Sequence, residues 1–185
     1  MPSALTPANQ ITLLRLALIP AFALLLLYGY LGSALIVFIV AGATDALDGF
    51  IARRSGQKTT LGAWLDPMAD KLLLTTTFVV LTLPLDHLAN RLPVWLTVLM
   101  ISRDVGIVAT VAIVNLAVGR QTFMPSIWGK IATATYILTG VVTLYFNYLR
   151  HASLVVDFFV WLSLAATLVS GLHYIWRATR SREHL

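Results

Sequence analysis

The chain has 185 residues, of which 58% are hydrophobic and 11% charged, and its mean hydropathy is +0.84. A soluble domain has about 25% charged residues, so this composition excludes a disordered chain and a typical soluble enzyme, and the absence of cysteine excludes a disulfide scaffold. The net charge of +5 suits an anionic surface, and because the basic residues border apolar stretches, the partner we expect is the lipid bilayer and not nucleic acid.

Six apolar stretches follow one another along the chain, each near the roughly 20 residues that a transmembrane helix needs. Proline and glycine separate them, and none alternates polar and apolar residues as a membrane strand does. The sequence therefore predicts an all-α integral membrane protein with six transmembrane helices, forming a single membrane domain over residues 1–185. The predicted spans are Ile11–Tyr30, Ser33–Ala52, Leu61–Leu83, Pro93–Val118, Ile127–Leu149 and Leu154–Trp176.

The basic residues between the spans predict the orientation. An even number of spans places both termini on one side, and most of the basic residues belong to that side: Arg53, Arg54, Lys58, Arg120, Lys130, Arg177, Arg180 and Arg182. Arg91 and Arg150 belong to the other side. Because loops rich in lysine and arginine stay in the cytoplasm, we expect both termini to be cytoplasmic, and we expect a bacterial inner membrane as the location.

Of the eight acidic residues, Asp157 lies at the start of the last predicted span and five more lie inside the other spans, where a carboxylate costs at least a few kcal/mol and is normally functional. Asp45 and Asp48 share one helical face, and Asp66 and Asp70 share another. With a short loop between the two helices, all four carboxylates can converge near the cytoplasmic side. They cannot all stay ionised without cations, so the spacing predicts Mg²⁺ or Mn²⁺, with two ions sharing the ligands. The fifth, Asp104, follows Arg103, and an ion pair between these two is an open alternative.

Small and basic residues lie among these aspartates. Gly49, Ala52 and Gly62 allow either close helix packing or the approach of a flat base and a diphosphate. Arg53 is placed where it can meet a phosphate.

Together the segment reads Asp45-x2-Asp48-Gly49-x2-Ala52-Arg53-x8-Gly62-x3-Asp66-x3-Asp70, which resembles the signature of the CDP-alcohol phosphatidyltransferases at every defined position. The resemblance implies an enzyme that transfers a phosphatidyl group from CDP-diacylglycerol to an acceptor hydroxyl and releases CMP. It also implies a homodimer. Carried over by position, Asp45, Asp48 and Asp66 are metal ligands, and Asp70 completes the metal site and acts as general base. The residues implied to bind the CDP-lipid are Asp48, Gly49, Ala52, Arg53 and Gly62.

The acceptor is suggested by further resemblances. The stretch from Leu65 to Lys71 and the opening Asn9-x2-Thr12-x2-Arg15-x4-Pro20 look like the branch that uses glycerol-type acceptors. This branch contains the phosphatidylglycerophosphate synthases and the CDP-alcohol type of cardiolipin synthase. Arg103 and Lys130 are the candidate binders of an acceptor phosphate, with a membrane-interface anchor as the alternative for each. Asn9, Thr12 and Arg15 are weaker candidates.

The residues contain features of enzymes that use two different acceptors, glycerol 3-phosphate and phosphatidylglycerol. Arg103-Asp104 stands where phosphatidylglycerophosphate synthases often have Arg-Glu, and the residues around it look closer to mitochondrial-type cardiolipin synthases. We favour glycerol 3-phosphate as the acceptor, because enzymes that use it are more widespread. The alternative is phosphatidylglycerol, and after it an inositol phosphate or another small alcohol.

Two other classes of membrane protein compete with the enzyme. A small transporter with an intramembrane acidic site would place acids along a pathway across the bilayer, and it would often show inverted repeats. Here the acids gather at one depth, and no repeat is found. A structural membrane subunit would not need four carboxylates at these spacings.

Overall fold

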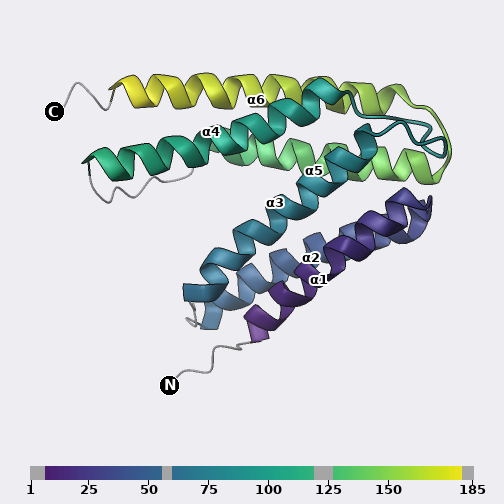
Figure 1. The fold of residues 1–185 in the computed structure, drawn as a ribbon, viewed down its shortest axis with the longest axis horizontal. Coiled ribbons are helices and arrows are strands. Elements are labelled where there is room, and N and C mark those ends of the chain that lie inside the picture. Colours follow the sequence, from purple (N-terminus) through teal and green to yellow (C-terminus); the bar gives the residue numbers. More distant parts are fainter. Residues whose placement is uncertain (1–6, 56–59, 119–126, 181–185) are drawn as a thin grey trace. The chain divides into compact units, whose positions relative to one another are not determined.

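The structure is a computed structural model, and it describes residues 7–55, 60–118 and 127–180. The side chains described are those of residues 10, 12–44, 68–110, 116 and 127–174. These ranges hold six helices and no strand (Figure 1), which confirms the all-α prediction. The helices are α1 (Pro7–Leu27), α2 (Leu31–Ser55), α3 (Thr60–Thr82), α4 (Val94–Val118), α5 (Ile127–Tyr148) and α6 (Leu154–Arg180).

The observed helices lie close to the predicted spans, and the largest differences are at two outer ends. The first helix begins at Pro7 instead of Ile11, and the last continues to Arg180 instead of Trp176. Hydropathy marks only the apolar part of a helix, whereas its backbone hydrogen bonds continue into polar sequence. Proline at the first helical position is favourable, since its missing N–H has no intrahelical partner there.

The helices group into two compact units, which we describe separately. The first comprises Met1–Arg91 and Thr143–Ala152, and the second comprises Leu92–Val142 and Ser153–Leu185. The last turns of α5 therefore belong to the first unit, together with α1, α2 and α3.

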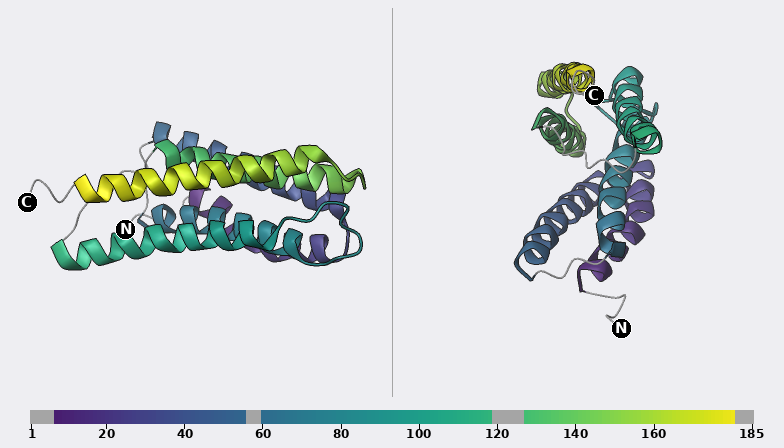
Figure 2. Two further views of the ribbon diagram at one scale, coloured as in Figure 1. Left: turned by 90° about the horizontal axis from the view of Figure 1, so that it is seen from above. Right: turned by 90° about the vertical axis from the view of Figure 1, so that its left-hand side faces the viewer.

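In the first unit, α1 packs against both α2 and α3 (Figure 2). Its buried face presents Phe22 and Leu26, which are fully buried. The ring of Phe22 lies 5.9 Å from that of Phe38 in α2, and α3 adds the fully buried Phe78. Aromatic and aliphatic side chains thus hold α1 as the central helix of this unit.

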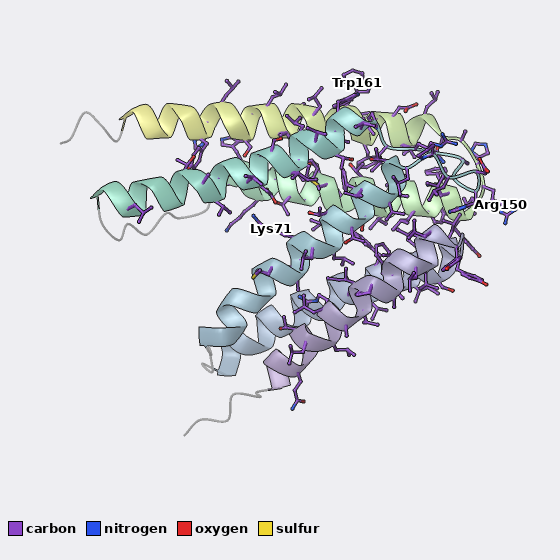
Figure 3. All side chains as sticks on the ribbon, in the orientation of Figure 1. Lys71, Arg150 and Trp161 are labelled. Atoms are coloured by element: carbon purple, nitrogen blue, oxygen red, sulfur yellow. The ribbon has the colours of Figure 1, made fainter. Side chains whose placement is uncertain are left out.

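Two helices of the first unit end in the same hydrogen-bonded turn. After α1, Gly29 has a φ of 79°, its N–H donates to the Leu26 carbonyl, and the Tyr30 N–H donates to Leu25. After α5, Arg150 takes the same role with a φ of 52° (Figure 3). This left-handed turn satisfies the last carbonyls of a helix, and it normally uses glycine. At Arg150 the residue type does not indicate such a turn.

A pair of asparagines ties the loop after α3 to the end of α5. The side chain of Asn147 accepts from the Asn90 N–H at 2.7 Å and donates to the Asn90 carbonyl at 2.9 Å. The Asn90 side chain in turn donates to the carbonyl of His151 at 2.7 Å. Asn147 is fully buried, so its amide supplies the hydrogen bonds that this loop backbone would otherwise lack.

Replacing Asn147 with alanine is expected to lower the free energy of unfolding by about 2–4 kcal/mol, because the buried N–H and carbonyl of Asn90 would both lose the hydrogen bonds that Asn147 makes with them. Thermal unfolding in detergent measures the effect. Asp86→Asn, an exposed substitution in the same loop, is the control and should leave the melting temperature unchanged. Equal melting temperatures for Asn147→Ala and the parent protein would show that this contact does not stabilise the fold.

In the second unit, α4 and α6 contact each other. The ring of Trp95 in α4 lies 5.8 Å from that of Trp161 in α6, and Figure 3 labels Trp161. Ser153 caps the N-terminus of α6, since its side chain accepts from the Val155 N–H at 3.2 Å. Asp157 in the first turn adds a charge that the helix dipole favours.

The apolar helices suit a bilayer. Among the described residues, α5 with 22 residues and the segment Leu154–Tyr174 of α6 with 21 are long and apolar enough to cross a membrane. Shorter apolar stretches lie in α1 (Thr12–Leu27) and in α2 (Leu31–Thr44). Crossing of the bilayer by all six helices, and the orientation, stay predictions.

Candidate active site

The aspartate motif lies on two helices of the first unit. Asp45, Asp48, Gly49, Ala52 and Arg53 belong to the second half of α2, and Gly62, Asp66 and Asp70 belong to the first half of α3. Each aspartate pair therefore has the helical spacing that places both members on one face. Apart from Asp70, the side chains of these motif residues lie outside the described part of the structure.

Asp70 is the motif carboxylate whose surroundings the structure gives. Its side chain is 43% exposed, and its Oδ1 accepts a hydrogen bond from Nη1 of Arg15 at 3.0 Å. Figure 3 labels Lys71, the next residue along α3. The neighbour Ala69 is fully buried, and Leu73 is nearly so. Asp70 is thus held at the edge of the α1–α3 contact, with part of its side chain accessible.

The partner Arg15 was one of the weaker sequence candidates. It lies in α1, fifty-five residues from Asp70, and its side chain is only 2% exposed. Thr12, another weak candidate, lies one turn earlier and is also buried. The side chain of Asn9, the third, lies outside the described part. The structure therefore brings one weak candidate to the proposed general base, a pairing that the sequence analysis did not predict.

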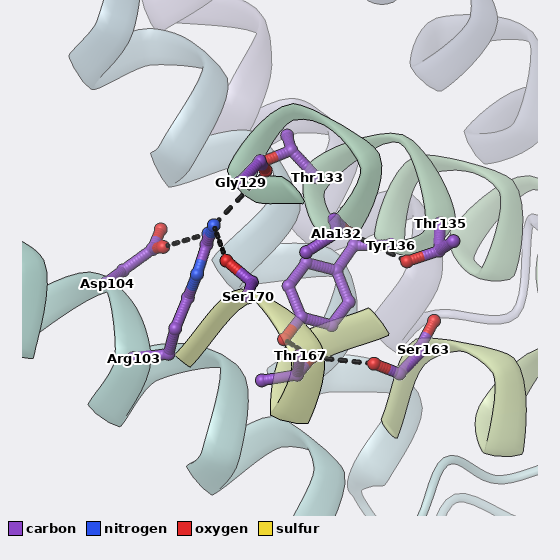
Figure 4. Close-up of polar contacts among 10 residues, drawn as sticks. All are labelled: Arg103, Asp104, Gly129, Ala132, Thr133, Thr135, Tyr136, Ser163, Thr167 and Ser170. Carbon is purple, nitrogen blue, oxygen red and sulfur yellow. Dashed lines mark hydrogen bonds and ion pairs between the residues drawn. The ribbon is translucent and has the colours of Figure 1, made fainter. Parts of the chain in front are cut away.

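The second unit holds Arg103, a predicted binder of an acceptor phosphate. Its Nη1 donates to Oδ1 of Asp104 at 2.9 Å, and its Nη2 donates to the Gly129 carbonyl at 3.1 Å (Figure 4). A longer contact of 3.4 Å reaches Oγ of Ser170. The ion pair between Arg103 and Asp104, left open by the sequence, is therefore present. A phosphate-binding role for Arg103 stays a prediction.

Lys130, the other predicted binder, is exposed in the first turn of α5. It directly follows Gly129, whose carbonyl accepts the hydrogen bond from Arg103. Arg103 thus contacts the first turn of the helix that carries Lys130. A lysine there is unfavourable for the helix dipole, whereas the N-terminus of a helix favours a bound anion.

Polar contacts between α5 and α6 continue from this point, and the sequence analysis missed them. The hydroxyls of Tyr136 and Thr167 are hydrogen-bonded to each other (Figure 4), and those of Thr139 and Ser163 lie 2.8 Å apart. All four residues are buried. The signal was present as polar residues repeated every fourth position of an apolar helix: Thr135, Thr139, Thr143 and Asn147.

Four carboxylates are hard oxygen donors, the ligand type that Mg²⁺ and Mn²⁺ prefer. The described member, Asp70, contacts the guanidinium of Arg15 and is partly exposed. Among the described side chains, no group of three histidines, cysteines or acids is placed to hold a metal. The other three carboxylates of the motif lie outside that part. The donor set therefore fits a divalent metal by its chemistry.

Comparison with known proteins finds the same family over most of the chain. A sequence model of the CDP-alcohol phosphatidyltransferase family matches residues 5–169. The chain is 35% identical to a probable phosphatidylglycerophosphate synthase of Mycobacterium tuberculosis, over 94% of this chain and 81% of the relative. It is 30% identical to a Bacillus subtilis CDP-diacylglycerol–glycerol-3-phosphate 3-phosphatidyltransferase, over 94% of this chain and 96% of the relative.

The chain is also similar to a relative whose name indicates a different product, cardiolipin. The human cardiolipin synthase (CMP-forming) is 33% identical over 91% of this chain, and the match covers 61% of the human protein. Similarity to known proteins thus extends to both members of the branch that the sequence motifs indicated.

Proposed function

The chain belongs to the CDP-alcohol phosphatidyltransferase family, and from this premise we propose that it transfers a phosphatidyl group from CDP-diacylglycerol to glycerol 3-phosphate and releases CMP. The observation that carries the proposal is the complete aspartate motif on α2 and α3. The names of the bacterial relatives support glycerol 3-phosphate as the acceptor. The protein is an enzyme of phospholipid biosynthesis.

Asp45, Asp48, Asp66 and Asp70 hold two Mg²⁺ or Mn²⁺ ions in this proposal. When bound, such ions neutralise the diphosphate and stabilise the departing CMP. Arg53 adds a positive charge to the CDP-lipid site. The small residues Gly49, Ala52 and Gly62 belong to the same CDP-lipid site, where they leave room for the cytidine and the diphosphate beside the helix backbones.

Asp70 is the general base. Its partly exposed carboxylate takes the proton from the acceptor hydroxyl, and the acceptor oxygen forms a bond to the phosphorus that carries the diacylglycerol. The bond from that phosphorus to the oxygen of CMP breaks, and CMP leaves with the electron pair. A carboxylate does this work best when its position is fixed before the substrate arrives.

The acceptor phosphate binds at the start of α5. Lys130 is exposed there, and the N-terminus of the helix adds its own preference for an anion. Arg103 reaches the same turn through the Gly129 carbonyl. A guanidinium offers five N–H donors, so Arg103 contributes positive charge at this place while it keeps its contact with Asp104.

Replacing Lys130 with alanine is expected to raise the KM for glycerol 3-phosphate by about 10–150-fold, because a charge-assisted hydrogen bond contributes roughly 1.5–3 kcal/mol. The KM for CDP-diacylglycerol should stay unchanged. Initial rates of CMP release measure both constants. Arg91→Ala removes an exposed cation from the loop after α3 and should change neither. An unchanged KM for glycerol 3-phosphate in Lys130→Ala would make Lys130 an anchor at the membrane interface.

The setting of this enzyme belongs to the same proposal. A single membrane domain crosses the inner membrane of a bacterium with six helices, both termini lie in the cytoplasm, and two copies form a homodimer. The excess of basic residues on the side of the termini supports the orientation. The apolar α5 and α6 support the membrane location.

Cardiolipin synthesis is the second candidate, with phosphatidylglycerol as the acceptor. The similarity to the human cardiolipin synthase favours it, as do the residues around Arg103-Asp104. The purified protein in nanodiscs, supplied with CDP-diacylglycerol and Mn²⁺ or Mg²⁺, separates the two candidates. CMP release with glycerol 3-phosphate alone supports the first, and release with phosphatidylglycerol alone supports the second. No release with either would direct the search to inositol phosphates and other alcohols.

A further inference from the structure

The contact between Arg15 and Asp70 joins the most deeply buried cation that the structure describes to a partly exposed carboxylate. The side chain of Arg15 is 2% exposed and that of Asp70 is 43% exposed. The two lie on different helices, α1 and α3, and Nη1 of the arginine donates to Oδ1 of the aspartate at 3.0 Å. One partner is therefore fixed inside the unit while the other reaches its edge.

Stability alone does not explain an arginine in this place. A guanidinium cannot lose its charge, so its burial costs several kcal/mol and demands a charged partner. Apolar side chains of similar volume at such sites often give an equally stable or more stable protein. The neighbours that share the buried face of α1, Ile19 and Phe22, are apolar. We therefore infer that Arg15 has a functional role that requires its positive charge and its planar hydrogen-bond donors.

The surroundings hold Arg15 in one place. Thr12 lies one turn before it and Ile19 one turn after it, both at the buried surface of α1. On α3, Asp70 lies between the buried Ala69 and Leu73. Burial thus limits the rotamers of Arg15, and its hydrogen bond commits Oδ1 of Asp70 to the direction of α1.

We propose that Arg15 is a positioning residue of the transfer reaction, which holds Asp70 in the orientation that it needs as general base and metal ligand. This inference rests on the proposed function, because Asp70 has no such role otherwise. It gives Arg15, one of the weaker candidates of the sequence, a role at the carboxylate site. Arg15 does not touch the substrate in this account and acts only through Asp70.

Arg15→Met tests the proposal with little risk to the fold. Methionine is unbranched and fills irregular apolar space, and the Asp70 that it leaves behind is exposed enough to be hydrated. We expect kcat to fall about 10–100-fold, the range seen when a group that orients a metal ligand is removed. The KM values for CDP-diacylglycerol and for the acceptor should stay within about twofold of the parent values.

Three further measurements separate positioning from packing. Mn²⁺ binding without substrate, followed by electron paramagnetic resonance, should weaken about 10–100-fold in Arg15→Met. Arg15→Lys, which keeps the charge but not the planar donors, should recover part of kcat. Ile19→Ala, a cavity variant one turn along the same face, should lower the melting temperature and leave kcat unchanged.

A double-substitution cycle links the effect to Asp70. Asp70→Asn and Arg15→Met with Asp70→Asn should have equal residual rates, because Arg15 acts on the reaction through the carboxylate that Asp70→Asn removes. An unchanged kcat in Arg15→Met, or an equal loss of kcat in Ile19→Ala, would overturn the inference. Normal turnover in Asp70→Asn would instead remove the general-base assignment in the proposed function, so the two failures are distinguishable.

Discussion

Replacing Asp70 with asparagine is expected to lower kcat by about 10²–10⁴-fold, the contribution of a general base, while the protein still binds CDP-diacylglycerol. The asparagine amide has nearly the same shape as the carboxylate. It carries no charge, however, and cannot accept a proton from the acceptor hydroxyl. Nearby, Arg15 would face a neutral oxygen in place of the anion that it contacts at 3.0 Å.

CMP release gives the rate, and the rise in melting temperature on adding CDP-diacylglycerol reports binding independently of turnover. Asp157→Asn is the matched control, since it makes the same chemical change at an exposed position in the first turn of α6. It should retain the parent rate. Loss of CDP-diacylglycerol binding together with the rate in Asp70→Asn would assign Asp70 to substrate binding and not to proton transfer.

The second large effect is expected from the metal site. Treatment with EDTA should abolish CMP release, and added Mg²⁺ or Mn²⁺ should restore it. In Asp66→Asn, the metal concentration for half-maximal rate should rise at least about 100-fold. Loss of a direct anionic ligand weakens metal binding more than loss of a residue that only orients a ligand, which typically weakens it about 10–100-fold. Asp66 is assigned as a metal ligand because its spacing from Asp70 places both residues on one face of α3.

Mn²⁺ binding in the absence of substrate gives a readout that does not depend on turnover. Asp104→Asn is the control, because this carboxylate belongs to the second unit and pairs with Arg103 at 2.9 Å. It should leave Mn²⁺ binding unchanged. A metal requirement that is identical in Asp66→Asn and the parent protein would contradict the ligand role of Asp66.

The helices and their approximate bounds were predictable from the sequence. Apolar runs separated by Pro84, Pro93 and Pro125 indicate where each helix begins and ends, and the structure confirms helices in all six places. The prediction works because both signals are local: a helix hydrogen-bonds within itself, and Pro84, Pro93 and Pro125 lie between helices, although Pro20 lies inside α1. Arg150 is the local exception, as nothing in its residue type indicates a left-handed backbone.

The motif aspartates and the family were also predictable, because residue types at fixed spacings carry the chemistry. The contacts between helices were not. Arg15 and Asp70 are fifty-five residues apart, and Asn90 and Asn147 are fifty-seven apart. No periodicity within one helix indicates which side chain of another helix it will meet, since this depends on the register in which the two pack. The hydrogen bond from Arg103 to the Gly129 carbonyl is a further example.

The central claim is that this enzyme attaches glycerol 3-phosphate to the phosphatidyl group of CDP-diacylglycerol. The most direct test supplies isotope-labelled glycerol 3-phosphate with CDP-diacylglycerol and Mn²⁺ or Mg²⁺ to the purified protein, and identifies the labelled lipid by mass spectrometry. We expect phosphatidylglycerophosphate from the parent protein and from Asp157→Asn, and a rate of its formation at least about 100-fold lower in Asp70→Asn. Absence of labelled lipid in the parent protein, with cardiolipin formed once phosphatidylglycerol is supplied, would contradict it.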